Sequence, residues 1–569
     1  MNLANVDYVE SLESLYAFQK QIEHVECLGL DTETTSLDPF NGRVRLLVIS
    51  DGTRVWIVDN FKFPVSSVMG SLQGKHLIAH NALFDFKFLA SEGFWPSGPI
   101  TCTLLLSQVL YAGLKADGNK VLSHSLQAVA KRELQLDVSK ELQKSDWSGA
   151  LSPEQIEYAA RDAQILPAIT ESLYKKIHHF KLDTAVSIEL RCFPAILWMS
   201  MAGIPFNWPR WKAVAEHEEL RATQLEKELN ASIFDILEPG EGVNWRSPQQ
   251  VKKVFSAIGI ELSTTKFEVI SAIEDPVAKM LTQYREAEKR IGTYGKNWEE
   301  YVKNGRIYPQ WGQCFTVTGR MSSNSPNFQN LPRSKQYREC IEASPGRKLV
   351  IADYSMIEVR IAAKLADEKR LIEAFHKKQD VHKLTASIIL NKHIDEITKD
   401  ERQIGKSCVF ALIYGAGAER LRQYAQSQFS IAISLEEATI YRNKFFEAFP
   451  GIRRWHKKQS NEPVTTRSLS GRWRIGVENY SEKLNSPDQS TGADGLKLAL
   501  ALLWERRIEC PASYPVIAAH DEIVIETTEK EAEKAKSWLI KAMKDGIEYM
   551  LHPIPVEVEA TIAQNWSEK

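Results

Sequence analysis

The chain has 569 residues, more than a single hydrophobic core usually holds, so we expect three or more domains. Lysine and arginine total 71 against 73 aspartates and glutamates, and the resulting formal net charge of −2 excludes a uniformly basic surface. Seven scattered cysteines without a Cys-x-x-Cys pair favour reduced thiols over disulfides or a zinc site.

The first residues do not show the pattern of an export signal. The stretch from Met1 to Asp7 lacks a basic region followed by an apolar region, and no apolar run in the chain reaches the length of a membrane span. We therefore expect a cytoplasmic protein with no membrane partner.

An apolar run near the amino terminus passes directly into acids. The residues from Leu28 to Thr35 predict a β-strand, on which Asp31 and Glu33 project to the same side because they are two positions apart. Asp85 follows a second apolar pair, Leu77-Ile78. Either fragment alone would also fit an acidic, solvated loop.

The residues from Pro153 to Asp162 predict the start of a helix, with proline in its first turn. Tyr158 and Asp162 then lie one turn apart on the same face. A partly buried tyrosine beside a solvated aspartate would give the same spacing. The pattern therefore points to a site only in combination with the acids that precede it.

Two long, charged amphipathic segments in the middle of the chain, Trp211 to Leu237 and Val277 to Trp298, predict helices. The amino-terminal pattern ends before them, so we expect a domain boundary near residues 176 to 190.

A second strand that ends in an acid begins at Leu349. The apolar run predicts a β-strand that places Asp353 at its end, before a helix-compatible segment that contains Glu358. Two carboxylates brought together from distant strand ends can hold a pair of Mg²⁺ ions about 3.5 to 4 Å apart. Asp353 as the N-cap of the following helix is the alternative.

Arg402, Lys406, Phe410 and Tyr414 recur every four residues, so a helix would carry all four on one broad face. Such a face offers two cations to a triphosphate and two rings to a base, although an ordinary amphipathic helix remains the alternative. Gly415 is expected to end the helix.

Near the carboxyl terminus, His520-Asp521-Glu522 lies between two short β-branched runs, from Val516 to Ala518 and from Ile523 to Ile525. The pattern predicts a β-hairpin with an exposed acidic pair at its tip, a place to hold metal. Acids in a turn are often merely solvated, so the pair gains meaning from Asp353.

Together, the amino-terminal fragments resemble the DEDDy exonucleases, a proofreading fold that relatives of ribonuclease D share. The resemblance implies a ribonuclease H-like domain over residues 1–180 and 3′ to 5′ excision of a primer strand. Tyr158 would position the attacking water; with an ordinary phenol pKa near about 10, it is cast as an orienting group rather than as the base. The implied ligands of two metal ions are Asp31, Glu33, Asp85 and Asp162.

The later motifs resemble motifs A, B and C of the family A DNA polymerases, the bacterial polymerase I group, over about residues 185 to 569. Further matching pieces are Thr318–Ser323, Pro326–Pro332, Asp380–His382 with Thr385 and Ala386, Asn485–Gln489, and Asn565-Trp566. The implied fold class is a multidomain α/β protein in which a right-hand polymerase of palm, thumb and fingers occupies 185–569. The thumb would span about 190–310, the palm about 311–360 and 480–569, and the fingers about 361–479.

The resemblance also assigns roles in adding deoxynucleotides to a primer 3′ end. Asp353 and Asp521 would bind two Mg²⁺ ions, with Mn²⁺ as a substitute, and Glu522 would support them from behind. Glu358 would obstruct the ribose 2′-hydroxyl and so select deoxynucleotides. The remaining residues implied to bind the nucleotide are Tyr354, His382, Arg402, Lys406, Phe410 and Tyr414.

The implied partners are primer–template DNA and deoxynucleoside triphosphates, together with a processivity factor or other replisome proteins. Basic runs around Arg333 and around Arg453 would give DNA affinity that does not depend on sequence, despite the balanced net charge. The residues implied to contact DNA are Arg320, Gln329, Asn330, Asn485, Gln489 and His520.

The layout, with no 5′ nuclease ahead of the exonuclease, is closest to phage-encoded members of the family, which would place the protein in the host cytoplasm. An exonuclease with a non-catalytic, DNA-holding polymerase-like module is the rival interpretation. Because Asp353, Asp521, Lys406 and Arg402 are all present, we expect DNA replication with proofreading instead.

Overall fold

The computed structural model describes residues 5–116, 120–138, 141–142, 144–234 and 242–569. The chain divides into two compact units. The first comprises Met1–Ala202, Gln310–Asn324 and Val350–Ile562, and the second comprises Gly203–Pro309, Ser325–Leu349 and Ala563–Lys569. Most of the predicted thumb therefore belongs to the second unit.

The amino-terminal part of the first unit is built on a mixed sheet in the order β1-β4-β3-β2-β5-β6. Strand β2 pairs antiparallel with β3 and parallel with β5. The strands are β1 (Asn5–Tyr8), β2 (Cys27–Thr34), β3 (Val44–Ser50), β4 (Arg54–Asp59), β5 (His76–Ala79) and β6 (Ile100–Cys102). The helices are α1 (Leu12–Ile22), α2 (Ser66–Leu72), α3 (Ala82–Ser91), α4 (Thr103–Leu110), α5 (Leu126–Leu134), α6 (Pro153–Gln164), α7 (Leu166–His179) and α8 (Asp183–Ala202).

Strand β3 is buried at every position because helices cover both faces of the sheet. Leu46 and Val48 pack with Ala159 and Ala163 of α6, whereas the alternate positions of the strand join the larger core on the other face. This packing fixes α6 across the sheet. The predicted strand at Leu28–Thr35 and the predicted helix beginning at Pro153 are both confirmed.

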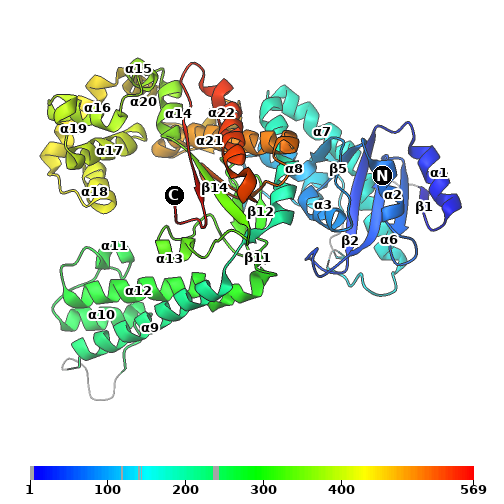
Figure 1. Ribbon diagram of the computed structural model, residues 1–569, viewed down its shortest axis with the longest axis horizontal. Coiled ribbons are helices and arrows are strands. Elements are labelled where there is room, and N and C mark those ends of the chain that lie inside the picture. The colour runs from blue at the N-terminus through cyan, green and yellow to red at the C-terminus, as the bar shows by residue number, and fades with distance from the viewer. Residues whose placement is uncertain (1–4, 117–119, 139–140, 143, 235–241) are drawn as a thin grey trace. The chain divides into compact units, whose positions relative to one another are not determined.

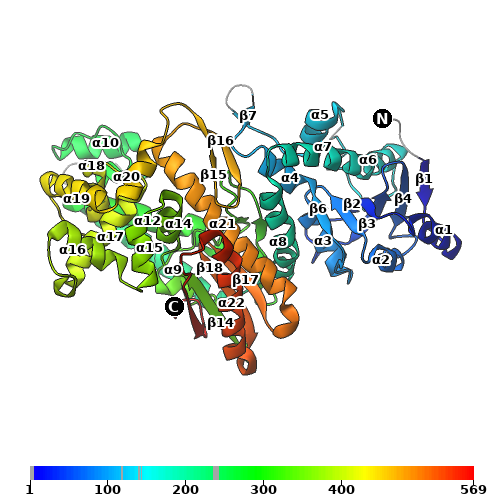
Figure 2. The ribbon, with the colours of Figure 1, turned by 90° about the horizontal axis from the view of Figure 1, so that it is seen from above.

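The polymerase-like part of the first unit centres on a sheet in the order β17-β18-β14-β19. Figure 2 shows the long helix α21 lying along α22 beside this sheet, and the two helices pack together. The elements are β14 (Arg347–Tyr354), β17 (Tyr514–Ala519), β18 (Glu522–Thr528), β19 (Val558–Ala563), α21 (Tyr480–Glu505) and α22 (Ala532–Leu551). Asp353 lies at the end of β14, and Met356 is the N-cap of the next helix, so the N-cap alternative for Asp353 is excluded.

The region predicted as fingers is mostly helical, and α16 packs against α17 (Figure 1). Its helices are α14 (Ile357–Ala366), α15 (Lys369–His376), α16 (Val381–Leu390), α17 (Lys399–Ile413), α18 (Ala418–Phe429), α19 (Leu435–Ala448) and α20 (Pro450–Lys457). A hairpin follows, formed by β15 (Val464–Arg467) and β16 (Trp473–Val477). A second hairpin, formed by β12 (Gln310–Gly312) and β13 (Ser322–Asn324), carries the Thr318-Gly319-Arg320 motif in its loop.

The second unit is organised around two long helices that pack on each other, α9 (Trp208–Ser232) and α12 (Pro276–Tyr294). Both predicted amphipathic helices are therefore present, although residues 235–237 of the first prediction lie outside the described residues. Its smaller elements are α10 (Pro248–Ala257), α11 (Phe267–Ile270), α13 (Lys335–Arg338), β9 (Ile204–Pro205), β10 (Val302–Lys303) and β11 (Arg306–Ile307).

Helix α8 is long and apolar enough to cross a membrane by length and composition, with a mean hydropathy of 1.3, contrary to the expectation from the sequence. It packs against α21 and β17, and 61% of its apolar window is buried. It also carries a fully buried glutamate, Glu189. These contacts are those of a core helix, so its length is weak evidence for a membrane span.

Glu189 belongs to a buried cluster of charges that joins four segments of the first unit. Arg472 lies 2.6 Å from Glu189 and 2.7 Å from Asp494, and Lys497 lies 2.5 Å from Glu189, with every side chain at most 1% exposed. Gln313 donates hydrogen bonds to the backbone and the side chain of Glu189. Burial raises the pKa of Glu189, but the charges of Lys497 and Arg472 outweigh burial and lower it overall.

Glu189→Ala should lower the free energy of unfolding by roughly 3–5 kcal/mol, because it leaves Lys497 and part of the Arg472 charge uncompensated in the core. Glu505→Ala is the matched control, since its ion pair with Arg191 is exposed and worth about 0–1 kcal/mol. Urea titration followed by tryptophan fluorescence measures both variants. Equal losses would contradict the role assigned to the cluster.

Candidate active sites

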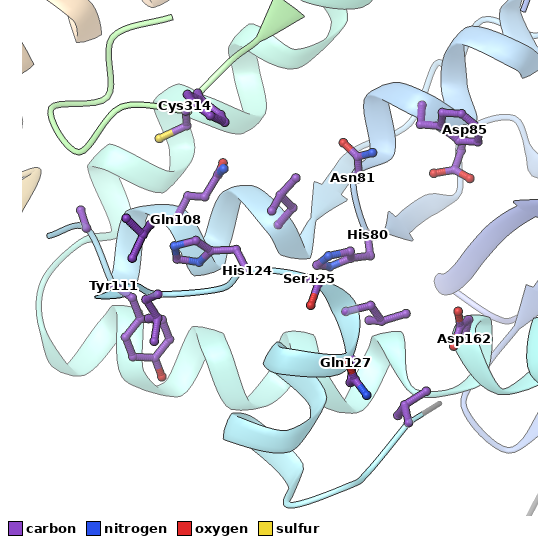
Figure 3. A pocket seen from close by; sticks show the side chains of 18 of the residues that line it. His80, Asn81, Asp85, Gln108, Tyr111, His124, Ser125, Gln127, Asp162 and Cys314 are labelled. Atoms are coloured by element: carbon purple, nitrogen blue, oxygen red, sulfur yellow. The ribbon is translucent and has the colours of Figure 1, made fainter. Parts of the chain in front are cut away.

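The side chains predicted for the exonuclease line one cavity of about 1740 Å³. Strand β2 supplies Asp31 and Glu33, helix α3 supplies Asp85, and helix α6 supplies Tyr158 and Asp162. In Figure 3, Asp85 and Asp162 lie at one end of this cavity, whereas Tyr111 and Cys314 lie toward the other. The structure thus brings together all five residues that the sequence singled out.

Thr32 holds Asp85 in place. Its backbone N–H and its hydroxyl both donate to Oδ1 of Asp85, at 3.0 and 2.7 Å. Thr32 alternates with Asp31 and Glu33 along β2, so one strand supplies two acids and also fixes a third from the neighbouring helix.

The four carboxylates are buried close together and repel one another. Burial first, and then the charges of the other acids, raise the pKa of Glu33 to about 9 and raise that of Asp31 well above its ordinary value. Burial also raises the pKa values of Asp85 and Asp162 to about 7. A divalent cation would stabilise the ionised forms, so the donors fit such an ion in kind and in charge.

Across the residues that the structure describes, no three His, Cys, Asp or Glu side chains have the close grouping of bound metal ligands. The fit at this site therefore rests on the chemistry and the mutual charge of the carboxylates. All seven cysteines are free thiols, as the sequence predicted.

Tyr158 is neutral over the ordinary pH range. Burial first, and then the charge of Asp162 and a hydrogen bond with it, raise the pKa of the Tyr158 phenol far above 10. Its ring lies 6.4 Å from the ring of Trp147, which is almost fully buried. A neutral, packed phenol can orient a water molecule but cannot accept its proton.

Sequence reasoning missed the polar wall of this cavity. Figure 3 shows Gln108, His124, Ser125 and Gln127 along it, from α4, α5 and the segment between them. Ser107 lies 2.8 Å from Nδ1 of His124, and burial together with the charge of Arg132 lowers the pKa of His124 to about 4. These residues have no motif spacing, so local patterns gave no signal for them.

The predicted β-hairpin at His520-Asp521-Glu522 is confirmed, with β17 and β18 as its strands. His520 is the exposed residue of its turn and adopts a positive φ of 57°. The prediction of an exposed acidic pair is wrong, because Asp521 is half-buried and Glu522 is only 5% exposed. Glu522 is the first residue of β18 and pairs with Ala519 of β17, so it lies in the sheet and not at the tip of the turn.

The hairpin and β14 bring the two predicted metal-binding acids of the polymerase to one edge of the sheet. The backbone N–H of Tyr354 donates to the backbone carbonyl of Asp521 at 3.2 Å. Asp353 is the residue before Tyr354, so this hydrogen bond holds the backbone of the two acids close together. The two acids are 168 positions apart in the chain. Two carboxylates at adjacent strand ends are a donor set that suits divalent ions.

The side chain of Tyr354 points into the core. Its side chain is 4% exposed, and its hydroxyl donates to the backbone carbonyl of Met543 in α22 at 2.6 Å. The assignment of Tyr354 to nucleotide binding is therefore not supported, and the residue instead fastens the end of β14 to a helix behind the sheet.

The predicted helical stripe is confirmed on α17. Arg402, Lys406, Phe410 and Tyr414 are all half-buried, whereas residues between them, such as Cys408 and Leu412, are fully buried. Gly415 follows with a φ of +81°, as expected of a residue that ends a helix. The nitrogen Nζ of Lys406 lies 5.3 Å from the ring centre of Phe429 in α18.

Two residues predicted to bind a triphosphate contact other side chains of the protein. Arg402 donates to the carboxylate of Asp380 at 2.6 Å, and Asp380 also caps the start of α16. His382 is 3% exposed, and its ring lies 5.7 Å from that of Phe410. Burial first, and then the charge of Arg402, lower the pKa of His382 to about 4, so it is neutral near pH 7.

Glu358 lies at the start of α14 and forms an ion pair with Arg320 at 3.3 Å. The electrostatic neighbours of Tyr414 include Glu358, Arg320 and Asp488 of α21. Asp488 is fully buried, and its carboxyl group lies beside the phenol of Tyr414. Sequence reasoning did not single out this aspartate.

The residues predicted to contact DNA fall in both units. Asn485 and Gln489 are half-buried and lie one turn apart on α21 in the first unit, which also holds Arg320 and His520. Gln329 and Asn330 belong to the second unit, where the backbone carbonyl of Asn330 accepts a hydrogen bond from Tyr294.

Comparison with known protein families gives two matches. Residues 212–568 match the model of DNA polymerase family A, and residues 6–178 match a 3′–5′ exonuclease model. Proteins of both families generally use divalent metal ions. The matched ranges contain all the carboxylates assigned to the two sites.

Similar proteins include DNA polymerase I of Aquifex aeolicus, which is 32% identical, with 99% of each chain covered. DNA polymerase I of Chloroflexus aurantiacus is 26% identical over 99% of this chain, which spans 63% of that relative. A solved structure, titled as the polymerase domain of Pol1 from M. smegmatis in complex with DNA primer-template and dNTP, has a TM-score of 0.83. It is 21% identical, with 99% of each chain covered, and so shows the fold alone.

These matches support template-directed DNA synthesis with 3′ to 5′ proofreading. The chain belongs to the family A DNA polymerases and carries a 3′–5′ exonuclease domain before its polymerase domain.

Proposed function

We propose that Asp353 and Asp521 bind the metal ions of the polymerase and that the four acids Asp31, Glu33, Asp85 and Asp162 bind those of the exonuclease. The observation that carries the first assignment is the backbone hydrogen bond between Tyr354 and Asp521, which brings two strand-end acids together. Asp353 and Asp521 would hold two divalent ions, Mg²⁺ by preference and Mn²⁺ as a substitute, which supply activation of the primer 3′-hydroxyl and neutralisation of the departing pyrophosphate. Glu522, buried behind the turn, would keep Asp521 in position.

The incoming triphosphate would bind along α17. Arg402 would exchange its contact with Asp380 for phosphate oxygens, and Lys406 would add a second cation one turn later. His382 is neutral and can therefore donate a hydrogen bond to a phosphate without a change of charge. Phe410 and Tyr414 would face the base of the nucleotide and the templating base.

Glu358 would select the sugar. Its ion pair with Arg320 holds the side chain at the start of α14, where a fixed carboxylate would crowd a ribose 2′-hydroxyl. Primer–template DNA would lie against Arg320, Asn485, Gln489 and His520 in the first unit. Gln329 and Asn330, which belong to the second unit, would also bind DNA.

In the exonuclease cavity, Tyr158 would orient the attacking water, and Thr32 would keep Asp85 aimed at the metal site. A neutral phenol serves this purpose without adding negative charge beside the phosphate under attack. The substrate would be the 3′ end of a DNA strand.

Asp488 would remain protonated beside the nucleotide. Burial first, and then the charge of Glu358, raise its pKa well above the ordinary value. A neutral carboxyl adds no repulsion toward a triphosphate or a template strand. Its burial against Tyr414 would therefore shape the nucleotide site rather than charge it.

The two activities should separate by mutation. Asp31→Ala combined with Glu33→Ala should abolish excision and leave primer extension, whereas Asp353→Ala should abolish extension and leave excision, because each pair of acids belongs to one site. Primer extension on a labelled primer–template with Mg²⁺, with and without deoxynucleotides, reports both reactions. A double variant that still degrades single strands would sink the exonuclease assignment. Failure of the wild-type chain to extend any primer would favour a non-catalytic, DNA-holding module.

Glu358→Ala should raise ribonucleotide incorporation relative to deoxynucleotide incorporation by roughly tenfold or more, because a removed side chain leaves room for the 2′-hydroxyl. Single-nucleotide insertion kinetics with a ribonucleotide and its deoxy counterpart measure the ratio. Glu419→Ala is the control, since Glu419 lies on α18 in an exposed pair with Arg422. Unchanged ribonucleotide incorporation by Glu358→Ala would show that the assignment is wrong.

Asp488→Asn should retain primer extension and stabilise the protein at pH 8, because burial raises the pKa of Asp488 well above its ordinary value and an amide avoids this cost. A carboxyl whose pKa is raised in the folded state loses stability for the fold as the pH rises, because the unfolded chain ionises first. Wild-type stability should therefore fall as the pH rises above about 4, whereas the amide does not titrate. Urea titrations at pH 4.5 and pH 8 measure the difference, with the exposed Asp367→Asn as control. A difference that does not grow with pH would show that Asp488 is ionised.

A further inference from the structure

The loop between β12 and β13 exposes a large aromatic side chain at the exonuclease cavity. Phe315 is 73% exposed and lines the same cavity as the four carboxylates, although it belongs to the polymerase part of the chain. A single exposed apolar residue is ordinary on a protein surface. Its place in the wall of a site that acts on nucleic acid makes this one informative.

The loop around Phe315 is anchored on both sides. Before it, Gln313 donates to Glu189 in the buried charge cluster, and Cys314 accepts from the guanidinium of Arg472 at 3.4 Å. After it, the hydroxyl of Thr316 donates to the carbonyl of Arg320 at 3.1 Å. The exposed ring therefore sits on a fixed support rather than on a flexible tip.

Gly319 adds to this rigidity. It adopts a φ of +77°, and a Cβ atom at its position would lie 2.9 Å from the guanidinium group of Arg472. Because the buried cluster holds Arg472, the turn after Phe315 packs directly against a fixed group.

The cavity is larger than one nucleotide needs. Pockets that enclose a drug-sized molecule are roughly 300–1,000 Å³, and this one is about 1740 Å³. Cys314, next to Phe315, lies toward the end away from Asp85 and Asp162 (Figure 3). A strand whose terminal phosphate lies at the carboxylates would therefore run on past the loop.

We propose that Phe315 is a stacking platform for an unpaired nucleobase upstream of the scissile phosphodiester, so that the polymerase part supplies one wall of the exonuclease subsite. Aromatic side chains bind single-stranded nucleic acid this way because every base offers a π-face. The exposed Lys115 of β7 (Lys115–Ala116) and Lys144 line the same cavity and offer positive charge to the backbone of such a strand. The proposal rests on excision at the four carboxylates.

The test compares Phe315→Ala, Phe315→Trp and wild type in steady-state excision of a short single-stranded oligonucleotide with Mg²⁺. Phe315→Ala should raise KM roughly tenfold with little change in kcat, and Phe315→Trp should restore it, because stacking binds the strand but touches no reacting atom. Tyr16→Ala is the matched control, an exposed aromatic on α1 outside the cavity. Extension of a fully paired primer should stay at the wild-type rate in all of them.

Oligonucleotides with one abasic position, moved stepwise from the 3′ end, locate the base. At one upstream position the abasic site should raise KM for wild type but not for Phe315→Ala. An unchanged KM in Phe315→Ala, equal losses of excision and extension, or no position that removes the difference would each overturn the platform. Absence of excision by the wild-type chain would instead overturn the proposed exonuclease function on which it rests.

Discussion

The buried charge cluster around Glu189 and Arg472 is the constraint on which the first unit depends. It links the helix that follows the exonuclease part, the loop between β12 and β13, the β15–β16 hairpin and α21. Charges in a dry interior are costly unless each meets an opposite charge in good geometry. The cluster therefore tolerates one arrangement of these segments, and that arrangement puts the Thr318-Gly319-Arg320 turn beside Glu358.

The carboxylates described at the two sites fall into three kinds, and the environment of each decides its kind. In the exonuclease cavity they crowd together, and their raised pKa values mark a place for cations. Glu358 and Asp380 instead face single arginines, which keeps them fixed in position. Asp488 meets no such partner and is held neutral by burial. The net charge of the chain, −2, gives no sign of these three kinds of carboxylate.

The sequence predicted those parts of the sites that short-range periodicity encodes. Acids at strand ends and a stripe at every fourth position depend on neighbours within a few residues, so Asp31, Asp353 and the Arg402–Tyr414 face were found. The burial of Glu522, the inward turn of Tyr354 and the exposure of Phe315 depend on segments far away in the chain. No local pattern encodes the packing of α22 against β14 or the anchoring of a loop by Arg472. The cations that compensate the buried Glu189 of the apolar helix α8 also come from distant segments.

The anchored loop also constrains how synthesis and excision communicate. Arg320 at one end of the loop pairs with Glu358 in the polymerase site, and Phe315, five residues earlier, lines the exonuclease cavity. Because Gln313, Cys314 and Gly319 all rest on the buried charges, the loop cannot swing between the two sites without uncovering Arg472. Exposing half-compensated charges in the core is expensive. It follows that the loop stays in place and that any strand end passing between the two sites has to move past a fixed wall.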